Sequence, residues 1–152
     1  MKDHLREIEL AKYLLSVPGL GIVTVAGILG EIGDISVYDH DRQLEKLAGL
    51  NLVEESSGEK KGKRRISKRG RATLRSLLYK ASLIMVAKNK EFKALYRHLR
   101  ERSQNPLTGT EAIVAICRKL LRLIFALLKK ETYYDPHKAL GEYRLAQLQQ
   151  AA

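Results

Sequence analysis

The sequence of 152 residues contains a single cysteine, Cys117, and no tryptophan. One cysteine excludes a disulfide framework and a zinc site built from several thiolates, which suits a reducing compartment. Histidine is also sparse, because the four histidines stand far apart in unrelated contexts: His4, His40, His98 and His137. Metal sites need several ligands at short, recurring spacings. We therefore predict no metal site and no bound cofactor in this chain.

A long uncharged apolar run is missing as well. The longest apolar stretch, residues 112–128, is interrupted by Arg118, Lys119 and Arg122, which are costly to bury in lipid. The N-terminus is charged and amphipathic and lacks the apolar core of a signal peptide. The sequence predicts a protein without a membrane segment, located in the cytoplasm.

Negative charge is scarce in the second part of the chain. Residues 1–58 carry five basic and ten acidic side chains, a net charge of −5, whereas residues 59–152 carry 23 basic and seven acidic ones, a net charge of +16. The total is the formal charge of +11. This asymmetry favours a polyanionic partner, with nucleic acid the first candidate and an anionic membrane the second.

Helical periodicity dominates the chain and predicts a mainly α fold with no internal repeat. We expect one domain over residues 1–135, followed by a mobile tail over 136–152. The domain would contain a helix-hairpin-helix at about 5–32, a basic serine loop at about 51–71, and a bundle of longer helices at about 72–130. Within these regions the expected helices are 5–16, 22–32, 41–47, a helix from residue 72, 90–102 and 108–130, and the loop allows short strands near 50–53 and 64–67.

Residues 18–29, "PGLGIVTVAGIL", contain a turn of a type that can bind phosphate. Helix, Pro-Gly-apolar-Gly turn and small-residue helix are typical of a helix-hairpin-helix, in which Gly19 and Gly21 let backbone N–H groups approach a phosphate. A dinucleotide fingerprint fits worse, because Thr24 replaces its third glycine and the preceding segment is helical. A simple helical turn that uses glycine for its backbone freedom stays as the alternative.

The densest positive charge follows at residues 60–75. We predict that its basic side chains contact nucleic acid: Lys60, Lys61, Lys63, Arg64, Arg65, Lys68, Arg69, Arg71 and Arg75. The alternative is a solvated charge run without a ligand. The recurring glycines and the continuation of positive charge into the next helix favour nucleic-acid contact.

Three serines, Ser56, Ser57 and Ser67, lie among these charges. The cations would stabilise the charge that develops when a hydroxyl attacks a phosphodiester, but no positioned base is readable from the sequence. On the residues alone, ordinary loop serines are the favoured interpretation. Cys117 is expected to be a packed core side chain, and Tyr133 and Tyr134 are expected to dock on the core rather than act as nucleophiles.

Several blocks in one order resemble a known family. They are "SVPGLGIVTVAGILGEIGDIS", "QLEKLAGL", "SSG" followed by "RRISKRGRATLRSLLYKAS", "CRKLLRLIFALL" and "YYDP". Together they resemble the C-terminal domain of IS110-type insertion-sequence transposases, over residues 17–136.

The resemblance implies DNA strand cleavage and rejoining by a serine that forms a covalent phosphoserine link. The family's serine precedes a glycine, which corresponds to Ser57 here, with Ser56 as the fallback, and the basic residues up to Arg75 would surround it. Complete members also carry an N-terminal acidic DEDD domain that uses Mg²⁺, and a structured bridge RNA can select the DNA.

The chain departs from the family pattern in one respect, because 152 residues leave no room for the acidic domain. The N-terminal DEDD domain is therefore expected to be absent, the chain to be a truncated form, and catalysis to need a homo-oligomer or a partner chain that supplies the acidic site. Two alternatives stay open: a non-enzymatic nucleic-acid-binding module, and a helical oligomerisation module whose 113–128 helix packs against a partner.

Overall fold

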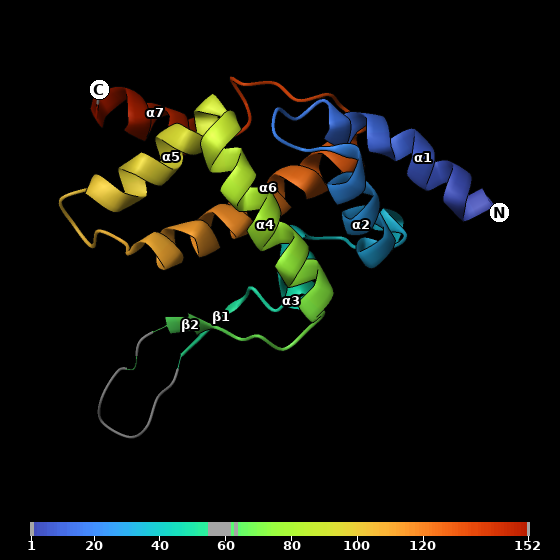
Figure 1. The fold of residues 1–152 in the computed structure, drawn as a ribbon, viewed down its shortest axis with the longest axis horizontal. Coiled ribbons are helices and arrows are strands. Elements are labelled where there is room, and N and C mark those ends of the chain that lie inside the picture. Colours follow the sequence, from blue (N-terminus) through green and yellow to red (C-terminus); the bar gives the residue numbers. More distant parts are fainter. Residues whose placement is uncertain (1, 55–61, 63, 152) are drawn as a thin grey trace.

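The computed structural model describes residues 2–54, 62 and 64–151 of the chain (Figure 1). The described residues confirm the mainly α fold. The elements are α1 (Lys2–Leu15), α2 (Ile22–Ile32), the 3-10 turn η1 (Ile35–Val37), α3 (Asp41–Ala48), strands β1 (Leu52–Glu54) and β2 (Arg64–Ile66), α4 (Ala72–Lys88), α5 (Lys90–Glu101), α6 (Gly109–Lys130) and α7 (Gly141–Ala151).

Helix α6 is the centre of the core. Ten of its residues are buried, on most sides of the helix, and helices α1, α3, α4 and α5 all contact it. The 113–128 segment is thus covered by the chain's own helices, which removes the basis for an oligomerisation module built on that helix. Cys117 is 1% exposed, as expected for a packed side chain, and burial raises the pKa of its thiol to about 11.

The start of α6 is fixed by a capping box, formed by Thr108 and Glu111. The Thr108 Oγ1 accepts a hydrogen bond from the Glu111 amide at 3.3 Å, and the Glu111 carboxylate accepts one from the Thr108 amide at 2.9 Å. These reciprocal bonds satisfy two backbone donors that an uncapped helix would leave without partners.

A buried asparagine joins three segments on one side of the core. Asn89 is 1% exposed; its Nδ2 donates to the Pro18 carbonyl at 3.1 Å and to the Tyr134 hydroxyl at 3.2 Å. The Tyr134 hydroxyl also donates to the Glu91 carboxylate at 2.8 Å, and the Tyr134 amide donates to the Ser16 Oγ at 2.9 Å. Burial raises the pKa of Tyr134. Tyr134 thus docks on the core, as predicted, and ties the segment after α6 to the turn between α1 and α2.

A buried carboxylate links α3 to α6. Glu45 is 4% exposed and lies 3.0 Å from the Nε of Arg122 and 3.4 Å from an Nη of Arg118. Two guanidinium groups offset the cost of removing one carboxylate from water. The Glu45 carboxylate thus neutralises part of the positive charge carried by residues 59–152.

Residues 136–152, for which the sequence predicts a mobile tail, contain α7, which contacts α5 (Figure 1). Its sequence, GEYRLAQLQQA, has only a weak apolar stripe, so periodicity gave little sign of it. Among the helices that the structure describes, none is long and apolar enough to cross a membrane.

Candidate nucleic-acid interface

The β1–β2 hairpin extends from the helical body at the ends of α3 and α4 (Figure 1). The strands pair antiparallel, with Leu52 opposite Ile66 and Glu54 opposite Arg64. They coincide with the short strands that the sequence allowed near 50–53 and 64–67. Residues 55–61 and 63 between the strands lie outside the described residues.

Two glycines join the hairpin to the end of α3. Gly49 has φ +69°, and a Cβ there would lie 2.6 Å from Nη1 of Arg75 and 3.0 Å from the Lys68 carbonyl carbon. At Gly70, with φ +150°, a Cβ would lie 2.5 Å from the Leu47 carbonyl oxygen. Both positions therefore require glycine for conformation and for space. The hairpin base is fixed against α3 by this close backbone contact.

Backbone and side-chain hydrogen bonds strengthen the same junction. The Lys68 amide donates to the Gly49 carbonyl at 3.0 Å, and the Arg71 amide donates to the Leu47 carbonyl at 2.7 Å. The Arg75 Nη1 donates to the Ala48 carbonyl at 3.2 Å, which orients the guanidinium at the start of α4. The basic residues that follow the hairpin thus start from a rigid base.

The basic side chains predicted as contacts fall into three groups. Lys60, Lys61 and Lys63 lie outside the described residues. Arg64 and Arg71 are exposed but paired, Arg64 with Glu54 at 3.1 Å and Arg71 with Glu31 at 3.4 Å. Lys68 and Arg69 are exposed, Arg65 is exposed and takes part in an interaction of its own, and Arg75 is half-buried. Exposed ion pairs contribute little to stability and exchange readily for another anion, so Arg64 and Arg71 stay available to a phosphate.

The serines divide in the same way. Ser56 and Ser57 lie outside the described residues, so the structure does not test either as the nucleophile. Ser67 is fixed within the hairpin base, because its Oγ donates to Asn51 Oδ1 at 2.7 Å and accepts from the Arg69 amide at 3.3 Å. These bonds give Ser67 a structural role at the junction.

The turn glycines, Gly19 and Gly21, lie elsewhere. A Cβ on Gly19, with φ +105°, would lie 3.0 Å from Sδ of Met85, near the C-terminal end of α4. Arg75 precedes Met85 by ten residues of helix, which corresponds to roughly 15 Å along the axis. The structure therefore does not bring the turn and the hairpin base together into one site.

The two glycines also differ in what surrounds them. Gly19 needs its positive φ and its contact with α4, whereas Gly21 has φ −95° and no atom within 4 Å of a Cβ built on it. Gly21 is the N-cap of α2, and no side chain caps the helix. The first amides of α2 therefore point outward, beside Ile22 and Val23, which are 75% and 85% exposed.

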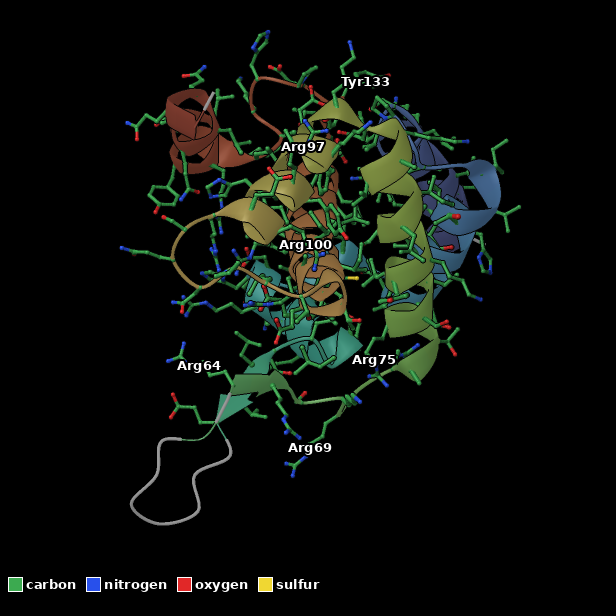
Figure 2. All side chains as sticks on the ribbon, turned by 60° about the vertical axis from the view of Figure 1, so that its left-hand side comes forward. Arg64, Arg69, Arg75, Arg97, Arg100 and Tyr133 are labelled. Carbon is green, nitrogen blue, oxygen red and sulfur yellow. The ribbon has the colours of Figure 1, made fainter. Side chains whose placement is uncertain are left out.

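Helix α5 carries a row of basic residues that the predicted contacts do not include. Lys90, Lys93, Arg97 and Arg100 recur at helical spacing and are exposed. Glu91, the acid in the first turn, is turned toward Tyr134 instead. Figure 2 shows Arg97 and Arg100 on α5, above Arg64, Arg69 and Arg75 at the hairpin end of the molecule. The recurrence of basic residues every three or four positions was the signal that could have identified this row.

A further group of cations gathers where α6 meets α7. Burial, followed by the charges of Arg122 and Arg144, lowers the pKa of Lys119. Burial also lowers the pKa of Arg144, and the charge of Arg102 lowers it further. Burial is the larger cause of both shifts, and the neighbouring arginines add to it.

No metal site competes with this interpretation among the residues that the structure describes. Within them, no three or more His, Cys, Asp or Glu side chains lie together in a group that could hold a metal ion. The chemistry that the described surface offers is cationic and hydrogen-bond donating, which suits phosphate oxygens.

Comparisons with known proteins identify the family of the chain. Residues 11–97 match the model of the transposase IS116/IS110/IS902 family. This range includes the turn, the hairpin, α4 and every residue predicted to contact nucleic acid.

Individual relatives give the same result. A transposase for insertion sequence element IS1111A from Coxiella burnetii is 36% identical over 129 residues, 78% of this chain and 33% of the relative. A probable family 20 transposase from Pseudomonas aeruginosa is 32% identical over 138 residues, 90% of this chain and 40% of the relative. A pilin gene-inverting protein from Moraxella bovis is 29% identical over 126 residues, 82% of this chain and 38% of the relative. The chain therefore spans less than half the length of these relatives.

Proposed function

Because the chain belongs to the transposase IS116/IS110/IS902 family, we propose that it is the DNA-binding and serine-bearing part of a DNA transposase. The relatives are insertion-sequence transposases and a gene-inverting protein, and both kinds of rearrangement need DNA strands to be cut and rejoined. We assign DNA as the substrate and Ser57, with Ser56 as the fallback, as the nucleophile.

The observation that carries the proposal is the rigid attachment of the basic hairpin. Gly49, Gly70 and Arg75 fix its base against α3, and the segment between its strands contains Ser57. A nucleophile gains reactivity when the groups that stabilise developing charge are held in place beforehand. The hairpin base supplies such groups as cations that start from a fixed backbone.

The proposed step conserves the energy of the phosphodiester bond. The Ser57 Oγ attacks a DNA phosphorus, the bond from Oγ to phosphorus forms, and the bond from phosphorus to one deoxyribose oxygen breaks. The proton of the serine leaves to a base and the departing deoxyribose oxygen takes up a proton. Attack of another deoxyribose hydroxyl on the phosphoserine reverses the step and rejoins a strand, so no external energy source is needed.

The Mg²⁺ expected for the family does not fit the residues described here, since they form no group of metal ligands. We therefore assign the acidic Mg²⁺ site to a part of the enzyme outside this chain, or to a partner in an oligomer. A structured RNA that guides the DNA remains part of the same proposal. No step above is routed through either.

DNA binding would involve two kinds of surface. The hairpin base and the α5 row would neutralise phosphates of the backbone. The turn around Gly21, if it acts as a helix-hairpin-helix, would offer the free amides of α2 to another phosphate. The second surface depends on backbone groups and the first on side-chain charge.

Covalent trapping tests the proposal directly. The chain is mixed with transposon-end DNA, Mg²⁺, guide-type RNA and a separately supplied acidic domain, and a denaturing gel is used to detect protein joined to DNA. We expect an adduct that Ser57→Ala abolishes and the matched control Ser56→Ala retains. An adduct that survives Ser57→Ala would contradict the assignment of the nucleophile.

A second candidate function is a nucleic-acid-binding module that does not cleave. The favouring observation is that most of the described basic residues at the hairpin are exposed, which is sufficient for contact with phosphates. This candidate predicts salt-sensitive DNA binding that is identical in wild type and Ser57→Ala, with no adduct on any DNA end.

A further inference from the structure

An open pocket of about 420 Å³ lies between α4, α6 and the base of the hairpin. Its apolar lining includes Leu50, Val114 and Cys117, of which Leu50 and Cys117 are 1% exposed. Helix α4 contributes Arg75, Tyr79 and Lys80 along the wall. Its volume lies within the range of small-molecule sites. The pocket joins an apolar surface to cations, and none of the described residues that line it is acidic.

The composition of the pocket matches one class of ligand. A nucleobase has two apolar faces that stack on aromatic rings or guanidinium planes, and its attached phosphates attract cations. The Tyr79 side chain is 37% exposed at the wall. The Ala48 carbonyl orients the guanidinium of Arg75 and leaves its other N–H groups for a ligand.

Its place in the molecule points the same way. Leu50 and Ile66 belong to the hairpin base, so the pocket opens where the hairpin joins the helical body. Where strands open, bases leave the stack and become available to a pocket of this kind. A pocket at the base of the hairpin would hold such a base and fix the phosphate next to it.

We propose that this pocket binds one unpaired nucleobase, stacked on Tyr79, with Arg75 and Lys80 at the adjoining phosphates. The inference rests on the proposed function, because it assumes that nucleic acid lies along the hairpin base. It adds a site for a base to a surface that otherwise recognises phosphate.

The absence of tryptophan from the sequence gives a direct test. In the Tyr79→Trp variant the only tryptophan stands at the pocket wall, where a stacked base quenches its fluorescence. Probes are a single-stranded thymidine oligonucleotide, the matched uridine oligonucleotide, polyphosphate and polyglutamate. The matched control is Tyr143→Trp, because Tyr143 lies on α7 and is 76% exposed.

We expect quenching of the Tyr79→Trp signal by at least one oligonucleotide, and little by polyphosphate or polyglutamate at equal occupancy. The oligonucleotide that quenches more identifies DNA or RNA as the source of the base. Equal quenching by all four probes would overturn the proposal, since the pocket would then respond to charge alone.

Affinity supplies a second measurement. Stacking on one base corresponds to about a 5- to 150-fold gain in affinity, so Tyr79→Ala should weaken single-strand binding by a factor in this range and leave its salt dependence unchanged. Tyr79→Phe keeps the ring and should bind as wild type. If Tyr79→Ala binds like wild type while binding remains salt-sensitive, the pocket is rejected and the proposed function survives. If the wild type binds no nucleic acid at low salt, both are rejected.

Discussion

The helices around α6 and the hairpin at the end of α3 reach a defined structure by different means. The α6 region buries a continuous apolar surface, with Leu120 and Ile124 fully inaccessible to solvent. The hairpin has strands of three residues each, whose side chains are largely exposed. Its position depends on Gly49 and Gly70, where backbones meet too closely for a side chain. Packing area thus stabilises the first region, and backbone geometry fixes the second.

This difference teaches where function can be placed. A side chain that packs the core is not free to bind a ligand, whereas a hairpin fixed by two glycine contacts leaves most of its side chains unused for folding. Variants in the α6 region should therefore change the free energy of unfolding, and variants on the basic surface should change binding alone. The predictions below test that separation.

The largest expected effect is in the centre of the core. Leu120→Ala removes a fully buried side chain and should lower the free energy of unfolding by about 3 kcal/mol, through lost burial and the cavity left behind. Urea denaturation followed by circular dichroism measures this. Leu83→Ala, at a position 47% exposed on α4, is the control and should change stability by less than about 0.5 kcal/mol. Equal effects at the two positions would contradict the assigned core.

The ion pairs of Glu45, which is buried, and of Glu54, which is exposed, allow the same comparison for charged groups. Glu45→Ala leaves Arg118 and Arg122 without their buried carboxylate and should cost about 2 kcal/mol, less than a fully buried pair because both arginines reach solvent. Glu54→Ala breaks the exposed pair with Arg64 and should cost below about 1 kcal/mol. Thermal denaturation of the two variants in parallel gives the comparison, and a larger loss for Glu54→Ala would refute it.

Burial of Cys117 predicts a loss of stability at high pH. Its thiol titrates near pH 9 when unfolded and at about 11 in the fold, so the unfolded chain releases its proton first. Stability should fall as pH rises from about 9 to about 11, by about 2 kcal/mol at pH 10.5. Cys117→Ala should lack this part of the decline. Urea titrations of both proteins at pH 8 and pH 10.5 measure the difference, and parallel declines would show that the thiol is not the cause.

Substitutions at the two turn glycines separate a role in folding from a role in DNA binding. Gly19→Ala combines a strained φ with a close contact to Met85 and should destabilise the fold by about 1–2 kcal/mol. Gly21→Ala meets no atom within 4 Å and should leave stability within about 0.5 kcal/mol of wild type. If the amides of α2 hold a phosphate, Gly21→Ala should still weaken DNA binding in a fluorescence anisotropy assay. Unchanged binding would remove the helix-hairpin-helix from the proposal.

Local features of the fold were predictable from the sequence, because their causes are local. The helix over 22–32 matched α2 since Gly21 and Gly33 flank it, and the Thr108–Glu111 spacing gave the start of α6. The Asn89–Tyr134 bonds join residues 45 positions apart, so no short pattern reveals them.

The candidate site was predictable only in part. The basic block was evident from composition, whereas its attachment through Gly49 and Gly70 depends on contacts between separate segments. The row on α5 was overlooked because its four charges are spread over eleven residues and become a surface only when the helix forms. The pocket at Tyr79 needed three segments to be placed together.

The smallest effect on stability is expected on the α5 row. Lys93→Ala and Arg97→Ala change exposed positions and should alter the free energy of unfolding by less than about 0.5 kcal/mol. If the row contacts the DNA backbone, each variant should weaken binding and lower the slope of log affinity against log salt by about 1. Arg42→Ala removes a charge at an exposed position of α3 and serves as the control for net charge alone. Because both kinds of variant lower the net charge equally, a slope change confined to the α5 variants locates the contact on that helix, whereas equal changes would reduce the row to a general electrostatic attraction.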